Sequence, residues 1–243
     1  MREVSLERGV VKGTKGLSCG TKFASRWLKQ KFLLSKTDFY FNGIVSAVPF
    51  IFYIGSKAMV DQEKIQKAVT MILEAIGENP EREGLVETPQ RVARMYAELT
   101  AGYSDSAKTH LAKVFTAENA EIVLEKDISF HSLCEHHMLP FFGKVHIAYI
   151  PDNKVVGLSK LARVVEVFAR RLQTQEQMTN QIADAINYEL APKGVLVIVE
   201  AEHTCMTMRG IKKIGSKTVS VSSRGEFSGN LSLQKSVQEL IKL

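Results

Sequence analysis

Apolar residues recur every three or four positions in two stretches after Met59, the spacing of helices that bury one face. The first stretch ends near Gly77, a residue type common at helix ends. The second follows Thr88-Pro89, a combination typical of a helix start. Its apolar positions are Val92, Met95, Tyr96 and Leu99, and those of the first are Ile65, Val69, Ile72, Leu73 and Ile76. We therefore expect an N-terminal helical pair within residues 59–120.

After residue 120 the pattern predicts four strands and two long helices. The strands are expected at 121–130, 143–150, 194–201 and 218–227, the helices at 159–172 and 175–190, and a short terminal helix at 231–243. This order predicts an α+β domain over residues 121–243, with an antiparallel four-stranded sheet and two helices on one face. Open sheet edges favour edge-to-edge assembly of several copies into a closed ring.

Residues 1–58 lack such periodicity. An apolar run between Phe39 and Gly55 is interrupted by Asn42 and Pro49, so it is shorter than the roughly 18–20 residues that span a bilayer. Three interpretations remain open. The segment is a non-native upstream stretch with Met59 as the true start, a disordered or targeting extension, or a weak membrane-surface anchor.

Most of the net charge of +6 belongs to this first segment. Residues 1–58 contain ten Lys and Arg against three Asp and Glu, a net +7, whereas the remainder has 22 against 23, a net −1. The basic excess therefore gives no argument that the domain binds nucleic acid. A hydrophobic content of 45% is ordinary for a globular protein, and three Cys are too few for a disulfide framework, which favours a reducing cytoplasm.

Two short clusters bring Cys and His together. Cys134-Glu135-His136-His137 offers a thiol and an imidazole three residues apart, and His203-Thr204-Cys205 lies about 70 residues later. Two Cys and one His would bind Zn²⁺ and leave a fourth position open, as in catalytic zinc sites. The alternative is a buried thiol beside surface histidines.

Cations and a hydroxyl are placed where an anion would bind. Ser159, Lys160 and Arg163 begin a predicted helix, whose first N–H groups are unpaired. Arg209 follows the second cluster. Together with the pair Arg91 and Arg94 on the N-terminal helix, these residues favour a polyphosphate ligand over scattered solvated bases.

Gln175-Glu176 also stands at a predicted helix start. A Glu there often only interacts with the helix dipole. Its carboxylate can equally accept two adjacent N–H groups, the edge that guanine presents.

Five motifs together resemble GTP cyclohydrolase I of the zinc-dependent type, over about Val60 to the C-terminus. They are Thr88-Pro89-x-Arg91-Val92-Ala93-x-Met95-Tyr96, Cys134-Glu135-His136-His137, Gly157-Leu158-Ser159-Lys160-x-x-Arg163, Gln173-Thr174-Gln175-Glu176 and Glu202-His203-Thr204-Cys205-x-x-x-Arg209-Gly210. Residues 1–58 have no counterpart in this resemblance.

The resemblance implies a zinc-dependent opening of the guanine ring of GTP, with release of formate and formation of 7,8-dihydroneopterin triphosphate. It implies the tunnelling fold, assembled as a homodecamer of two stacked pentamers with sites between subunits. The implied zinc ligands are Cys134, His137 and Cys205, and the implied proton-transfer residues are His136 and His203. The implied guanine contacts are Gln175 and Glu176. The implied triphosphate or ribose contacts are Ser159, Lys160, Arg163, Arg209, Arg91 and Arg94.

Two alternatives differ in class. A relative such as the nitrile reductase of queuosine synthesis would need a nucleophilic Cys and a nicotinamide site. A non-catalytic zinc scaffold would close the metal with a fourth protein ligand, such as His136. The remaining histidines, His110, His131 and His146, are expected to be structural or without a role.

Overall fold

A computed structural model describes residues 60–118 and 121–243. These residues belong to one compact unit, Tyr53–Leu243. The interpretations of residues 1–58 fall outside the described residues. None of the helices within 60–118 and 121–243 is both long enough and apolar enough to cross a membrane.

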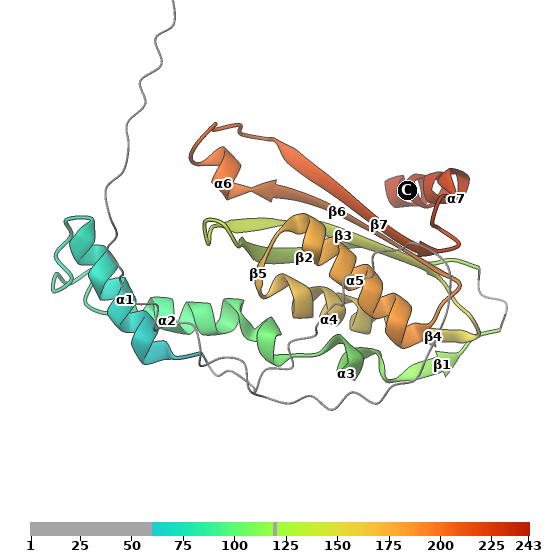
Figure 1. The fold of residues 1–243 in the computed structure, drawn as a ribbon, viewed down its shortest axis with the longest axis horizontal. Helices are drawn as coiled ribbons and strands as arrows, with labels where there is room; N and C mark the ends of the chain where they lie inside the picture. The colour runs from blue at the N-terminus through green and yellow to red at the C-terminus, as the bar shows by residue number, and fades with distance from the viewer. Residues whose placement is uncertain (1–59, 119–120) are drawn as a thin grey trace, which may run out of the picture. The chain divides into compact units, whose positions relative to one another are not determined.

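The centre of the domain is a sheet of four long antiparallel strands (Figure 1). They are β2 (Val123–Cys134), β3 (Pro140–Ile150), β6 (Gly194–His203) and β7 (Lys217–Gly225). A fifth strand, the two-residue β5 (Leu172–Gln173), pairs in parallel with the end of β2. The four predicted strands are confirmed, and β5 is an addition that no sequence pattern indicated.

Helices α4 (Leu158–Ala169) and α5 (Gln175–Leu190) cover one face of this sheet (Figure 1). Their apolar positions interlock with the inward side chains of β2, β3 and β6 in one core. Members with no exposed surface include Phe141, Val145, Leu161, Val164, Ile182 and Val197. On the other face, α7 (Leu231–Lys242) packs through Val237 in a smaller cluster with Leu196 and Phe227.

Gly143 permits the close pairing of β3 with β6. A Cβ at this position would lie 1.9 Å from the carbonyl oxygen of Glu200 on β6. Only glycine allows that approach. The pairing aligns Phe141 with His203, so the ends of β3 and β6 meet where the Cys and His clusters lie.

The N-terminal helical pair is also confirmed. Helices α1 (Gln62–Ala75) and α2 (Thr88–Leu99) pack on each other and are followed by η1 (Ala101–Ser104) and α3 (Ala107–Leu111). Strand β1 (Val114–Thr116) pairs with β4 (Lys154–Val156).

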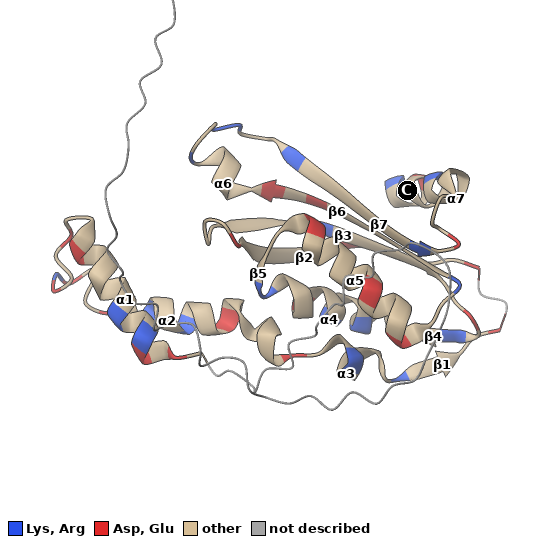
Figure 2. Cartoon of the chain, viewed as in Figure 1, with Lys and Arg blue, Asp and Glu red and all other residues tan. Residues whose placement is uncertain are grey.

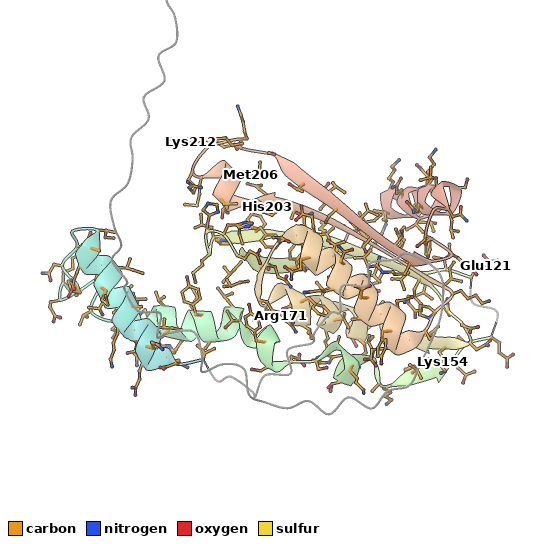
Figure 3. All side chains as sticks on the ribbon, in the orientation of Figure 1. Glu121, Lys154, Arg171, His203, Met206 and Lys212 are labelled. Atoms are coloured by element: carbon orange, nitrogen blue, oxygen red, sulfur yellow. The ribbon has the colours of Figure 1, made fainter. Side chains whose placement is uncertain are left out.

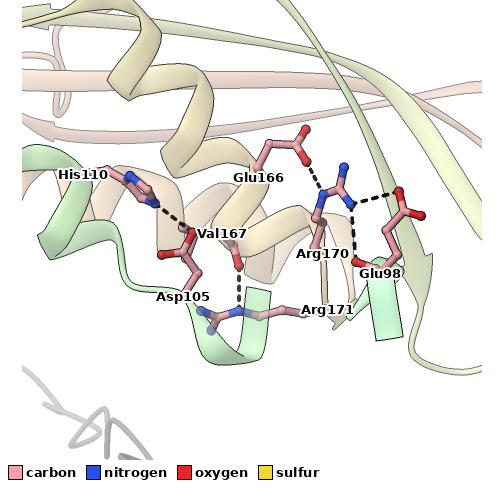
Figure 4. A network of polar contacts seen from close by, with 7 residues as sticks. All are labelled: Glu98, Asp105, His110, Glu166, Val167, Arg170 and Arg171. Atoms are coloured by element: carbon pink, nitrogen blue, oxygen red, sulfur yellow. Dashed lines mark hydrogen bonds and ion pairs between the residues drawn. The ribbon is translucent and has the colours of Figure 1, made fainter. Parts of the chain in front are cut away.

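Two arginines at the end of α4 connect it to this N-terminal part (Figure 4). Arg170 forms ion pairs with Glu166 and Glu98. The Arg171 Nε donates to the carbonyl oxygens of Val167 and Gly102, at 2.7 and 3.2 Å.

The structure corrects three boundaries. The helix predicted over 159–172 ends at Ala169, and Leu172 belongs to β5 instead. The first two strands were predicted too short: β2 continues to Cys134 and β3 begins at Pro140. The loop between them is therefore 135–139, and Cys134 is held by the sheet.

Candidate metal and nucleotide site

Cys134 lies at the last position of β2 and is buried. A tight turn follows it, in which the Cys134 amide donates to the carbonyl of Leu139 and the Met138 amide donates to the carbonyl of Cys134, both at 2.8 Å. The amide of Glu135 donates to the carbonyl of Gln173 on β5 at 3.0 Å. These hydrogen bonds hold the main chain of the turn in place, and with it the positions from which the side chains of His136 and His137 extend.

Cys205 is brought to this turn from the other side. It lies in α6 (Thr204–Thr207), which follows β6 directly. The hydroxyl of Thr204 donates to the carbonyl of Pro140 at 2.6 Å and so ties α6 to the start of β3. In Figure 3 the labelled His203 and Met206 mark this end of the sheet.

Cys134, His137 and Cys205 form a group able to hold one metal ion, with their ligand atoms all within 4.8 Å of one another. Two thiols and an imidazole are the donors that Zn²⁺ prefers. Burial, and secondly the nearby Cys134, raise the pKa of the Cys205 thiol. A bound cation would favour the thiolate, so the donor set fits a zinc ion.

His136 does not belong to this three-residue group, although its Nδ1 lies 3.7 Å from the Cys134 Sγ. Its Nε2 lies 3.8 Å from a carboxylate oxygen of Glu135. A three-ligand group leaves a coordination position for a water or substrate, which is the arrangement of catalytic zinc sites.

His203 lies beside the metal group in a fixed orientation. Its ring stacks on that of Phe141, with centroids 4.7 Å apart and planes 1° from parallel. Its Nε2 lies 2.8 Å from the Oε1 of Gln175. Burial lowers the pKa of His203, and the nearby Glu176 opposes this effect. The imidazole is therefore neutral at pH 7, as a proton acceptor must be.

The two residues that begin α5 differ in exposure. Glu176 is exposed, whereas Gln175 is 1% exposed. The Gln175 Nε2 lies within hydrogen-bonding distance of three acceptors, the carbonyls of Val199 and Thr218 and the Ser220 hydroxyl, at 3.0, 3.1 and 3.0 Å, and its two hydrogens are shared among them. Gln175 thus lies behind the site, with its amide already bonded, and of the two only Glu176 has a side chain open to solvent.

Arg209 follows α6 and reaches the metal group. Its NH1 lies 3.0 Å from the Nε2 of His137. Figure 2 colours further basic positions on the connection between α6 and β7. The sequence places Lys212 and Lys213 in this connection. This side of the site is therefore positively charged.

The other predicted cations are not beside the metal group within one copy of the chain. Ser159 and Arg163 line a hollow of about 490 Å³ together with residues 125–129 of β2 and Glu166. Ser129 precedes Cys134 by five residues, which corresponds to about 16 Å along the strand. Lys160 lies on the same first turn of α4 and is partly buried.

Arg91 and Arg94 are exposed on α2, and Arg91 pairs with Glu87. Across residues 60–118 and 121–243, no ion pair or hydrogen bond joins either arginine to the metal group.

The remaining histidines have local partners. The Nδ1 of His146 accepts a hydrogen bond from the Asp127 amide at 3.2 Å, His131 stacks on Phe142, and His110 contacts Asp105 at 2.8 Å. His110 lies in α3 rather than in a loop.

The fold and the site define a class of protein: an α+β protein with a Cys/His/Cys group that could hold a metal ion and a partly buried imidazole beside it. A family model for GTP cyclohydrolase I matches residues 65–242. The chain belongs to the GTP cyclohydrolase I family.

Curated relatives support this assignment. The chain is 63% identical to GTP cyclohydrolase 1 of Clostridium kluyveri over 184 residues, which cover 76% of this chain and 100% of that protein. It is 60% identical to GTP cyclohydrolase 1 of Carboxydothermus hydrogenoformans, over 75% of this chain and 96% of that protein. These matches do not favour the nitrile reductase or scaffold alternatives.

Among solved structures, the archaeosine synthase QueF-Like in the apo form is similar with a TM-score of 0.37 and 19% identity. The match covers 44% of this chain and 97% of that one. A likeness at this level is too low to establish a shared fold. The α+β fold described above agrees with the tunnelling fold that membership of the GTP cyclohydrolase I family implies.

Proposed function

We propose that this chain catalyses the GTP cyclohydrolase I reaction, the first step of folate or pterin biosynthesis. Water opens the imidazole ring of the guanine in GTP, formate leaves, and 7,8-dihydroneopterin triphosphate forms. The observation that carries the proposal is the convergence of Cys134, His137 and Cys205 beside the neutral His203, in a member of this family.

We propose Zn²⁺ as the metal, held by Cys134, His137 and Cys205. When bound, zinc acts as a Lewis acid and lowers the pKa of water toward neutrality. The sulfur and nitrogen donors and their mutual distances within 4.8 Å support this choice.

His203 and His136 are proposed to transfer protons to and from the ring nitrogens of guanine. Proton transfer by a positioned imidazole is a common form of general acid–base catalysis. Glu176, exposed at the first turn of α5, is proposed to accept the two N–H groups of the guanine edge. Burial lowers the pKa of His203, and the Glu176 carboxylate is near enough to oppose this effect in part.

The triphosphate requires cations from more than one copy of the chain. Arg209 lies at the metal group, whereas Ser159, Lys160 and Arg163 line or adjoin a separate hollow on α4. We propose that a neighbouring copy supplies Ser159, Lys160 and Arg163 to each site, with Arg91 and Arg94 of α2 on the phosphate side. The proposed assembly is a homodecamer of two stacked pentamers, in which neighbouring sheets meet at their edges.

The proposed compartment is the cytoplasm. Cys134 and Cys205 are both free thiols, and a metal site of this kind needs them reduced.

The proposal is tested by measuring GTP turnover of the purified full chain, with formate and the fluorescent oxidised pterin followed in parallel. We expect both products in equal amounts, loss of both after zinc chelation, and recovery on adding Zn²⁺ back. Binding of GTP without formate release in the zinc-loaded protein would contradict catalysis.

The shared site is tested by subunit complementation. Cys205→Ser removes a metal ligand and Arg163→Ala removes a phosphate contact, so each variant alone should be nearly inactive. In randomly mixed oligomers made by co-expression, about a quarter of the sites combine the intact halves of both chains, so activity should return to about that fraction. Absence of recovery in verified mixed oligomers would place the whole site in one copy.

A further inference from the structure

We propose that Gln175 is a positioning residue that fixes His203 as the tautomer with hydrogen on Nε2 and thereby leaves Nδ1 as its proton-accepting nitrogen. This inference deepens the proposed function and rests on it for the role of His203. It differs from the expectation that Gln175 binds guanine.

The orientation of the Gln175 amide follows from its neighbours. Carbonyl oxygens only accept hydrogen bonds, so the amide atom within 3.0 Å of the Val199 carbonyl and 3.1 Å of the Thr218 carbonyl must be the nitrogen. The Oε1 therefore faces His203.

The hydroxyl groups around Gln175 close a consistent ring of hydrogen bonds. Thr179 donates to the main-chain carbonyl of Gln175 at 2.7 Å, so its oxygen is free to accept from Ser220, also at 2.7 Å. The Ser220 oxygen in turn accepts from the Gln175 Nε2 at 3.0 Å. Each hydroxyl donates once and accepts once, and no flipped amide satisfies this ring.

The tautomer of His203 then follows. The Gln175 Oε1 lies 2.8 Å from the His203 Nε2 and can only accept, so that nitrogen carries the hydrogen. A neutral imidazole carries one hydrogen on its two nitrogens, so Nδ1 has none. Within residues 60–118 and 121–243 no hydrogen bond to Nδ1 is recorded.

The arrangement also explains why Gln175 is buried. Its side chain joins three elements: α5, on which it lies, β6 through Val199 and His203, and β7 through Thr218 and Ser220. Phe141 on β3 holds the imidazole face. His203 is thus fixed both in rotation, by the stacking, and in hydrogen position, by the amide.

The direct test is solid-state ¹⁵N NMR of the full-length, zinc-loaded protein with ¹⁵N-labelled histidine, where the spectrum of His203→Gln assigns the signal. At a pH where imidazoles are neutral we expect hydrogen on Nε2 only. A His203 signal with hydrogen on Nδ1 would overturn the proposal. This measurement does not need turnover, so it stands or fails apart from the proposed reaction.

A kinetic test uses Gln175→Met, which keeps much of the volume but can neither accept from Nε2 nor orient the ring. Groups that orient a functional histidine typically contribute about 10- to 100-fold, so kcat should fall by that factor while the KM for GTP changes little. The His203 ¹⁵N signals should show a mixture of tautomers, with the zinc content unchanged. A raised KM with an unchanged kcat would instead show that Gln175 contacts the guanine.

Ser222→Ala is the matched control. Ser222 lies in the same contact between α5 and β7 and donates to Asn180 at 2.8 Å, but it has no bond to His203. We expect unchanged kcat and an unchanged His203 spectrum. Equal loss in this control would mean that the effect of Gln175→Met is a general loosening of α5. If Gln175→Met does not fold, the wild-type spectrum alone still decides the tautomer.

Discussion

The end of β6 and the turn after β2 each present one non-ligand imidazole at the metal group, but they hold it differently. His203, on β6, is partly buried, stacked on Phe141 and bonded to Gln175. His136, on the turn, has a side chain that is 65% exposed and contacts Cys134, Glu135 and His137. A rigid imidazole needs supporting polar groups from other elements, whereas an adaptable one needs only an anchored backbone.

The largest change removes the feature common to both regions. Cys134→Ser and Cys205→Ser each delete a thiolate ligand, so zinc should be lost from the purified protein. Lewis-acid stabilisation is worth several kcal/mol, which corresponds to a loss of about 10³-fold or more in turnover. Metal content and formate release measured on the same samples check this. Retained zinc together with retained turnover in either variant would exclude that thiol as a ligand.

The next change separates the two regions. His203→Ala and His136→Ala should each lower kcat by about 10²- to 10⁴-fold, the usual range for a proton-transferring group. Added imidazole should restore part of the activity of His136→Ala, because that position is open to solvent. In His203→Ala the space left is partly buried, so added imidazole should not bind there in the correct orientation and should restore little activity. Equal recovery of the two variants would contradict the difference in how they are held.

A smaller change loosens only the β6 side. The Thr174 hydroxyl accepts from the Gln177 amide at 3.2 Å and caps the helix whose first turn carries Gln175 and Glu176. Thr174→Ala should cost about 1 kcal/mol of unfolding free energy, measured by urea titration. Thr174→Ser retains the cap and should remain close to the wild type. Stability lost equally in both variants would assign the effect to the Thr methyl group.

The smallest effect comes from a histidine in neither region. Burial lowers the pKa of His146, which accepts a hydrogen bond from the Asp127 amide. The unfolded chain binds its proton first, near pH 6.5, so this histidine should lower stability as the pH falls from there toward its folded pKa. The loss should level off once the folded histidine is protonated as well. His146→Asn keeps a hydrogen-bond acceptor but cannot become charged. Between pH 7 and pH 5.5 its urea midpoint should therefore fall less than that of the wild type. An identical fall in the two proteins would contradict the assignment to His146.

The long elements could be predicted from sequence because their apolar residues either form a continuous run, as in β6, or recur at helical spacing, as in α4. The run Val195 to Val199 is buried in β6, and Leu161, Val164 and Phe168 share the inner face of α4. The three residues of the metal group were named by the resemblance to GTP cyclohydrolase I, because spacing alone left open which histidine completes the set, and the structure brings these three together.

What the sequence did not show depends on pairing between distant segments. Strand β5 has two residues, too few for a periodic pattern, and its parallel partner lies some forty residues earlier. Gln175 and Glu176 look equivalent as neighbours, but helix geometry buries the first and exposes the second. The role of Gln175 depends on oxygen atoms of β6 and β7, which no local spacing encodes.

The hydrogen bond from the Glu135 amide to the Gln173 carbonyl joins the turn after β2 to the segment that leads into α5. In hydrogen exchange, an amide in an exposed turn usually exchanges within seconds, whereas this one should exchange only when β5 separates from β2. The two imidazole-bearing regions would then open together as one cooperative unit. Slow exchange at Glu135, coupled to that of the first turn of α5, is the signature of this shared opening.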